Sequence, residues 1–264
     1  MNTTTVDLDA YFDRIGYTGS RDAAVGLLVA LHRHHAAAIP FENLDVLLRR
    51  PIRLDLDSLQ AKLVTARRGG YCFEHNTLFA AVLRDLGFDV GTLEARVRPP
   101  GATRTLPRTH MVLRVDVDGR RFLVDVGFGG DGPVGPVDLD GIPTDQGLDT
   151  YRVVDEDRTK VLQVRRDTHW QDLYAFGLEP ALAVDFDVAN HYTSTHPGSP
   201  FTQTLTVQRS VNGERRILRH RTLTIRSAAG TVVREVAEEQ LTDVLRDLFG
   251  LELDGSAEAV ERPA

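Results

Sequence analysis

The only cysteine of the chain, Cys72, lies where a helix is expected to begin. The spacing that follows predicts a helix ending at Gly87, with one face formed by Cys72, Asn76, Phe79, Leu83 and Leu86. A helix N-terminus beside an imidazole is the usual setting in which a thiolate forms near neutral pH. The preceding Gly69-Gly70 pair allows another segment to approach closely. We interpret Cys72 as a candidate nucleophile, against the alternative of a small, inert core residue.

A candidate base and its orienting group come from a predicted β-hairpin. Alternating stretches flank Asp118-Gly119, the dipeptide most typical of a two-residue hairpin turn. This turn would pair Val112 with Asp125 and His110 with Gly127. His110 and Asp125 would then be diagonal neighbours on one face, within reach of a side-chain hydrogen bond.

The position of Asp125 in an apolar strand also points to a partner. A buried, unpaired aspartate is costly, and His110 is the available partner. The opposite face is expected to face the core and carries Met111, Leu113, Val115, Phe122, Val124, Val126 and Phe128. Cys72, His110 and Asp125 together supply a nucleophile, a base and a group that orients the base. The alternatives are a core or edge histidine for His110 and a surface charge for Asp125.

Helices are expected to position the cysteine, because the first ninety residues have mainly helical periodicity. A short helix covers about Asp9–Ile15, and a longer one follows Ser20 as its N-cap. A third helix covers Leu56–Ala66, with Asp57 or Ser58 at its start.

Three histidines, His32, His34 and His35, crowd the last turn of the longer helix. We expect a solvated turn whose cations interact favourably with the helix dipole. A metal site is less favoured because the adjacent His34 and His35 cannot easily face one ion.

Arg68 is a candidate partner for Glu42 or Asp45 in the loop that leads to Cys72. These two acidic residues lie in an otherwise apolar turn and need partners if they are buried.

Strands are expected to dominate from Thr92 to about residue 128, followed by a loop through Gly147. Further strands are predicted within Tyr151–Val164 and around Asn212-Gly213. The chain then ends in an amphipathic helix over Val236–Phe249 and a frayed tail beyond Asp254, with Leu241, Val244, Leu245 and Leu248 on the apolar face of the helix.

The composition limits the possible partners. The chain has 264 residues, 42% of them hydrophobic, and a formal net charge of −7, which argues against nucleic acid or an anionic membrane as the main partner. One cysteine forbids an internal disulfide. The chain lacks a leader-like segment and an apolar run near membrane-spanning length, so we expect a cytoplasmic protein.

Several motifs together resemble those of the arylamine N-acetyltransferases. They are Pro40-Phe41-Glu42-Asn43-Leu44, Arg68-Gly69-Gly70-Tyr71-Cys72-Phe73-Glu74, Thr109-His110-Met111, Val124-Asp125-Val126-Gly127-Phe128-Gly129, Asn190-His191-Tyr192-Thr193-Ser194 and Pro200-Phe201. The resemblance covers essentially the whole chain. It implies an α+β fold with a Cys/His/Asp core like that of cysteine proteases. The implied parts are a helical bundle (1–91), a central β-barrel (92–200) and a C-terminal α/β lid (201–264).

The family's chemistry is a ping-pong transfer from acetyl-coenzyme A to arylamines, arylhydrazines or arylhydroxylamines, part of xenobiotic metabolism. The resemblance implies a catalytic triad in which Cys72 forms an acetyl thioester, His110 moves the protons and Asp125 orients His110. It implies no metal and no tightly bound cofactor, since acetyl-coenzyme A is a co-substrate. Phe41 and Phe128 would line the slot for the aromatic acceptor. Thr109, Gly129 and Gly130 would border the pantetheine channel.

Other functions share these residues. A macrolactam-forming amide synthase of the same family would act on a polyketide thioester and an aromatic amine, and would have a wider cleft beside Cys72. A cysteine peptidase or a transglutaminase-like enzyme would use the same Cys/His/Asp logic. A small-molecule binding protein would leave the cysteine idle.

Overall fold

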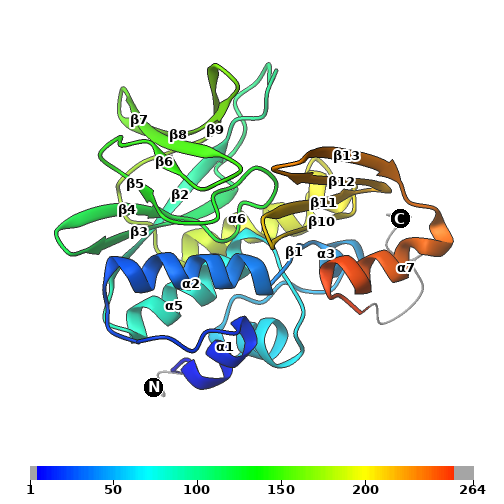
Figure 1. The fold of residues 1–264 in the computed structure, drawn as a ribbon, viewed down its shortest axis with the longest axis horizontal. Helices are drawn as coiled ribbons and strands as arrows, with labels where there is room; N and C mark the ends of the chain where they lie inside the picture. Colours follow the sequence, from blue (N-terminus) through cyan, green and yellow to red (C-terminus); the bar gives the residue numbers. More distant parts are fainter. Residues whose placement is uncertain (1–4, 253–264) are drawn as a thin grey trace.

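A computed structural model describes residues 5–252 as three packed parts (Figure 1). Helices α1, α2 and α5 form one layer, the β-barrel lies above them, and a five-stranded sheet stands beside the barrel with α7 below it. The elements before the barrel are α1 (Leu8–Ile15), α2 (Val25–Ala38), β1 (Phe41–Glu42), α3 (Leu44–Leu47), α4 (Leu56–Leu59), the π-helical η1 (Gln60–Thr65) and α5 (Cys72–Asp85).

The helix starts differ from two of the sequence-based expectations. Ser20 does not cap α2: the helix begins at Val25, whose backbone N–H donates to a carboxylate oxygen of Asp118 at 3.1 Å. A distant hairpin turn therefore supplies the cap that local sequence was expected to provide. The third helix is capped by Asp55, which accepts from the backbone N–H of Ser58 at 3.0 Å, rather than by Asp57 or Ser58.

The expectation of a solvated histidine turn is wrong. His32 and His35 are fully buried, because the C-terminal half of α2 packs between α1 and α5 rather than against solvent. The ring of His34 is partly buried, and its Nδ1 lies 3.0 Å from the carbonyl oxygen of Ile15.

The barrel is an eight-stranded antiparallel sheet in the order β5-β4-β3-β2-β9-β8-β7-β6. Its two ends approach each other where the N–H of Asp138 donates to Thr144 Oγ1 at 3.5 Å. The strands are β2 (Asp89–Val97), β3 (His110–Val117), β4 (Arg120–Val124), β5 (Val137–Asp138), β6 (Thr144–Asp145), β7 (Thr150–Glu156), β8 (Thr159–Arg166) and β9 (His169–Phe176).

The predicted hairpin turn is confirmed. Asp118 and Gly119 have φ values of 53° and 70°, and Leu113 pairs with Val124 in the expected register. The ladder ends at that pair, so the two pairings expected beyond it, which involve His110 and Asp125, are absent. The N–H groups of residues 126 and 127 instead donate to Asn76 and Asp125 side chains.

The hairpin is buried on both faces. Most of the predicted core face packs against the helices, as expected, and comprises Met111, Leu113, Val115, Phe122, Val124 and Val126. Phe128 departs from this set: it packs with the barrel interior beside Val112 and Leu123. The chain leaves the strand after Val124, so strict alternation no longer fixes the direction of Phe128.

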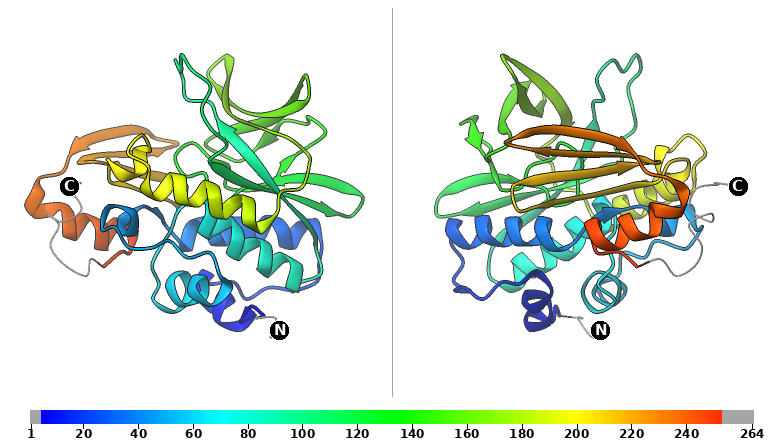
Figure 2. Two further views of the ribbon diagram at one scale, coloured as in Figure 1. Left: turned by 180° about the vertical axis from the view of Figure 1, so that it is seen from behind. Right: turned by 45° about the vertical axis from the view of Figure 1, so that its right-hand side comes forward.

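After the barrel, α6 (Ala183–Thr195) runs alongside α5 toward the last sheet (Figure 2, left). Sequence periodicity did not single out this helix. The last sheet has the order β1-β10-β11-β12-β13 and therefore includes Phe41 and Glu42 from the N-terminal part. The elements of the C-terminal part are η2 (Pro200–Thr202), β10 (Thr206–Val211), β11 (Glu214–Arg219), β12 (Thr222–Ser227), β13 (Gly230–Glu235), η3 (Glu238–Gln240), α7 (Leu241–Val244) and η4 (Leu245–Phe249).

The predicted C-terminal helix is present as the η3, α7 and η4 turns. Leu241, Val244 and Leu245 are buried in the core of this part, with Leu248 packed against them. The tail beyond Asp254 lies outside the described residues. Within residues 5–252, no helix is both long enough and apolar enough to cross a membrane.

Candidate active site

Cys72 is the first residue of α5, as predicted, and only 3% of its surface is exposed. Its thiol lies 3.8 Å from the carbonyl oxygen of Thr109. The helix start is fixed by Glu74, whose carboxylate accepts from the backbone N–H of Tyr71 at 3.0 Å. This interaction satisfies a donor at the end of the helix and anchors the residue before the cysteine.

The approach to Cys72 is held by the predicted ion pairs. Arg68 Nη2 contacts Glu42 Oε1 at 2.7 Å and Asp45 Oδ1 at 3.2 Å, which confirms the proposed partners. The close approach predicted at the glycine pair is also present. A side chain at Gly69 would collide with the carbonyl of Pro40. The segments come this close because Phe41 and Gly70 form a parallel bridge.

His110 and Asp125 form a buried pair, with 2.7 Å between Nε2 of His110 and Oδ2 of Asp125. The other carboxylate oxygen accepts from Asn76 Nδ2 at 3.0 Å and from the N–H of Gly127 at 3.0 Å. Every oxygen of this buried carboxylate thus has a hydrogen-bond donor, as a buried charge requires.

The opposite charges of His110 and Asp125 stabilise each other. Burial alone would lower the pKa of His110, but attraction to Asp125 and hydrogen bonds to Asp125 and Cys72 raise this pKa to about 10. Burial acts to raise the pKa of Asp125, but the His110 charge and the donated hydrogen bonds hold it below its ordinary value. An imidazolium beside a carboxylate is therefore the favoured resting form.

Asn76 is a site residue that sequence reasoning missed, because it was used only to define a helix face. One turn after Cys72, it donates to Asp125 and to the carbonyl of Met111 at 2.8 Å, and it accepts from the N–H of Val126 at 3.1 Å. The signal available in the sequence was an amide on an otherwise apolar helical face. Asn76 fixes both the carboxylate and the chain that follows it.

Gly127 sets the distance between strand and helix. A side chain at this position would place its Cβ 2.8 Å from Cα of Cys72 and 2.9 Å from Nδ2 of Asn76. These distances are shorter than real Cβ contacts, so only glycine lets the segment after Asp125 lie against the start of α5.

Two aromatic rings frame His110. The ring centroids of Phe128 and Tyr174 lie 5.2 Å and 5.0 Å from that of His110. Tyr174, on β9, is a second residue that sequence reasoning missed, since nothing in local spacing links residue 174 to residue 110. The two rings hold the imidazole in one orientation.

Four of the five residues predicted to bind substrate lie around one small cavity. Phe41, Phe128, Gly129 and Gly130 line this space of about 40 Å³, together with Asp125, Gln208 and Arg215. The fifth, Thr109, does not line this cavity; its carbonyl oxygen lies 3.8 Å from the Cys72 thiol. Asp131, the acidic residue of the following loop, is paired with Arg166 at 2.7 Å.

His75, three residues after Cys72, is buried in contacts with the helical bundle. Its Nδ1 lies 2.8 Å from Nε2 of His35, and its Nε2 donates to the carbonyl of Pro40 at 3.2 Å. Burial lowers the pKa of His75 to about 4. No cluster of three or more potential metal ligands occurs among residues 5–252.

Comparisons with known proteins agree with one another. A model of the N-acetyltransferase family matches residues 24–258. An arylamine N-acetyltransferase of Mycolicibacterium smegmatis is 43% identical over 259 residues, covering 94% of this chain and 93% of that protein. An Escherichia coli protein of the same name is 42% identical over 196 residues, covering 74% of this chain and 69% of its own length. The structure of Mycobacterium marinum arylamine N-acetyltransferase superimposes with a TM-score of 0.91 at 38% identity, with 97% of each chain covered.

Proposed function

Because the chain belongs to the arylamine N-acetyltransferase family, we propose that it transfers acetyl groups from acetyl-coenzyme A to arylamines, arylhydrazines or arylhydroxylamines. A related Mycobacterium marinum structure was determined in complex with CoA, and a Salmonella typhimurium relative is also named an N-hydroxyarylamine O-acetyltransferase. The observation that carries the proposal is the buried His110–Asp125 pair, 2.7 Å between its atoms, beside the thiol that begins α5.

In the first half-reaction, His110 already holds the proton of the Cys72 thiol as an imidazolium, and the sulfur attacks the acetyl carbonyl. The bond from the acetyl carbon to the coenzyme sulfur then breaks, and His110 returns the proton to the leaving thiolate. Asp125 keeps His110 oriented and stabilises its charge. The N–H of Phe73, in the first turn of α5, would donate to the oxyanion, because the first N–H groups of a helix have no acceptor within it.

In the second half-reaction, the nitrogen of the acceptor attacks the acetyl-Cys72 thioester. His110 takes the proton from that nitrogen and keeps it while the carbon–sulfur bond breaks, which restores the imidazolium beside the Cys72 sulfur. Phe41 and Phe128 contact the aromatic ring of the acceptor, while Thr109, Gly129 and Gly130 border the pantetheine arm. Acetyl-coenzyme A and the arylamine are thus successive ligands of one site, and no metal takes part.

The relatives that the comparisons found are named arylamine N-acetyltransferases, which favours acetyl transfer over the amide synthase alternative. The single unpaired cysteine and the acidic net charge of −7 fit a cytoplasmic location, which fractionation of the producing cells would test.

The decisive test is a mass measurement on the intact protein. Incubation with acetyl-coenzyme A alone should add one acetyl group, and the Cys72→Ala variant should stay unmodified. Addition of an arylamine should then remove the adduct and release the acetylated amine. A wild-type protein that gains no acetyl group would refute the proposed function.

A further inference from the structure

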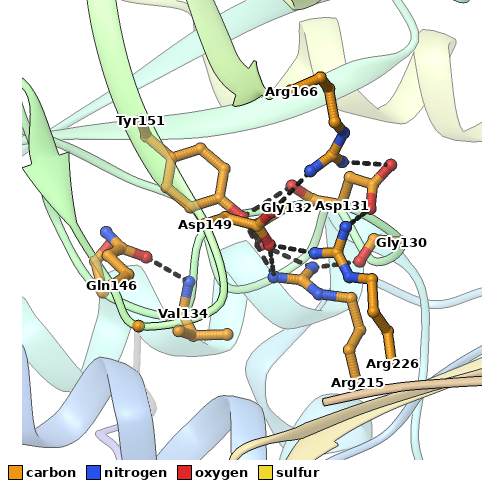
Figure 3. Close-up of polar contacts among 12 residues, drawn as sticks. Gly130, Asp131, Gly132, Val134, Gln146, Asp149, Tyr151, Arg166, Arg215 and Arg226 are labelled. Atoms are coloured by element: carbon orange, nitrogen blue, oxygen red, sulfur yellow. Dashed lines mark hydrogen bonds and ion pairs between the residues drawn. The ribbon is translucent and has the colours of Figure 1, made fainter. Parts of the chain in front are cut away.

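A cluster of charges centred on the buried Asp149 and Arg215 joins the last sheet to the barrel (Figure 3). Arg215 of β11 and Arg226 of β12 reach across to Asp149, which directly precedes β7. Arg166 at the end of β8 contacts both Asp149, at 2.5 Å, and Asp131. Three guanidinium groups therefore surround two carboxylates, and the contacts connect segments that lie far apart in the sequence.

Arg215 differs from the other two arginines in what it holds. Its side chain is only 5% exposed, and Nη1 donates to the carbonyl oxygens of Gly130 and, at 2.8 Å, of Gly132. Its Nη2 contacts Asp149 at 3.2 Å and the hydroxyl of Tyr151 at 3.1 Å. For Arg166 and Arg226, the contacts to this cluster go to carboxylates and include no loop carbonyl.

Tyr151 completes the attachment of the loop. Its hydroxyl lies 2.9 Å from the carbonyl oxygens of both Asp131 and Gly132. Three successive carbonyls, of Gly130, Asp131 and Gly132, thus face Arg215 and Tyr151 (Figure 3). A short loop can be fixed firmly by such contacts because its own backbone groups have few other partners.

The same loop is continuous with the proposed active site. It follows Phe128, which packs on His110, and Gly127, which lies against Cys72. Gly129 and Gly130 have φ values of +69° and +45°, so the loop makes a tight turn there. Both glycines line the small cavity beside Asp125, and Arg215 lines it as well.

We propose that Arg215, held by Asp149 and Tyr151, is a positioning residue that keeps loop 129–132 closed over the cavity and Phe128 against His110. The proposal extends the proposed function, because the closed loop limits how substrates reach Cys72 and orients the base that serves it. Loosening the loop admits larger molecules and at the same time slows the chemical step.

The test compares Arg215→Lys with Arg226→Lys, a matched control with the same chemical change. Lysine keeps the charge but has one nitrogen in place of the two Nη atoms that divide the contacts of Arg215 between the loop carbonyls and Asp149. Tyr151→Phe is a second variant that removes only the hydroxyl. Alkylation of Cys72 is followed by intact mass with iodoacetamide and with a bulky maleimide, which needs no acetyltransferase activity. The rate of acetylation by acetyl-coenzyme A is measured separately at increasing concentrations.

For Arg215→Lys and Tyr151→Phe, alkylation by the maleimide should become at least about tenfold faster, the effect of losing one or two hydrogen bonds. Acetylation at saturating acetyl-coenzyme A should become slower, and Arg226→Lys should resemble wild type in both assays.

Wild-type maleimide rates in both folded variants would overturn the proposal. An equal change in Arg226→Lys would also overturn it, since the effect would then come from the charge cluster as a whole. Absence of acetylation in the wild-type protein would refute the proposed function but leave the alkylation result decisive for the loop.

Discussion

The buried histidines on and around helix α5 differ in electrostatic character. On the barrel side, His110 is paired with Asp125, and this partner raises the pKa of His110 to about 10 despite burial. On the bundle side, His35 and His75 are buried without a carboxylate partner, and burial lowers the pKa of both rings. Burial is the same in both places, so the presence of one carboxylate decides whether the imidazole carries a charge.

The hydrogen bonds on the bundle side are consistent with two neutral rings. His75 must donate through Nε2, because its partner there is the carbonyl of Pro40. Its Nδ1 then accepts from His35, and His35 in turn accepts from the hydroxyl of Tyr11 at 2.8 Å. This chain uses each ring nitrogen once and needs no extra proton, so it stabilises the bundle but offers no charged group for catalysis.

The largest effect on this difference between the histidines is expected from Asp125→Asn. Without the carboxylate, burial dominates, and the pKa of His110 should fall below its ordinary value of 6.5, as it does for His75. Acetylation of Cys72 should slow by roughly 10³- to 10⁴-fold, the scale known for loss of the carboxylate in such triads. NMR titration of the histidine ring protons and intact mass over time would measure the two effects.

The control for this change is Asp138→Asn. Asp138 is also a buried carboxylate of the barrel, but its partner is Arg120, at 3.0 Å. This variant should acetylate at the wild-type rate. Equal losses in the two variants would show that barrel stability, and not the charge on His110, limits the reaction.

Gly127→Ala should break the contact between the helix and the strand that carries the pair. The added methyl group would lie 2.8 Å from Cα of Cys72, so the strand must shift away from α5. A displacement of about 1 Å costs on the order of 10²-fold in rate. The matched control is Gly91→Ala in β2, where the new methyl group would be 3.9 Å from its nearest neighbour. Single-turnover acetylation rates and thermal unfolding are measured for both variants. A slower rate with an unchanged unfolding temperature in Gly127→Ala would show displacement of the site and not general destabilisation.

Asn76→Ala should weaken the same site by a smaller amount. The change removes one donor from Asp125 but leaves the His110 contact and the Gly127 N–H in place. A hydrogen bond to a charged group corresponds to a rate loss of about 10- to 100-fold. Thr77→Ala, one position along the same helix, should have little effect on kcat/KM. Full activity in Asn76→Ala would mean that the remaining contacts suffice to orient Asp125.

The smallest expected effect concerns the histidines of the bundle, and it changes the free energy of unfolding and not the reaction rate. The pKa of His75 is about 4 in the folded protein and about 6.5 when the chain is unfolded, so the unfolded state binds more protons at mildly acidic pH. The free energy of unfolding should therefore decrease as pH falls from 6.5 toward 5, by up to about 1.4 kcal/mol per pH unit for each such ring. Urea unfolding of wild type and of a His35→Leu/His75→Leu variant would test this. The variant should be less stable at pH 7 but should have a flatter pH dependence; an unchanged slope would contradict the assignment.

Much of the site was predictable because its determinants are local. The Asp118-Gly119 turn fixes the register of the hairpin up to Leu113 and Val124, and the alternation of side chains beyond that pair predicts the contact between His110 and Asp125. Helical spacing and the glycine pair located Cys72 at the start of α5. The family motifs linked these segments, and the ion pair between Arg68 and Glu42 followed from the rule that buried charges need partners.

Contacts between distant segments could not be obtained in this way. The α2 start was misplaced because its cap comes from Asp118, ninety-three positions away in sequence. A run of histidines near a helix end predicts a solvated turn, whereas the packing of α2 between α1 and α5 buries His32 and His35.

The sequence alone thus determined which residues could perform the chemistry: a lone cysteine at a helix start and a histidine and an aspartate linked by a two-residue turn. The tertiary structure decided their electrostatic state and surroundings. Burial beside Asp125 charges His110, whereas burial without a carboxylate keeps His75 neutral. Asn76, Tyr174 and Arg215 join the site from other elements. The physical reason is that local periodicity specifies faces and turns, while desolvation and pairing depend on which faces meet.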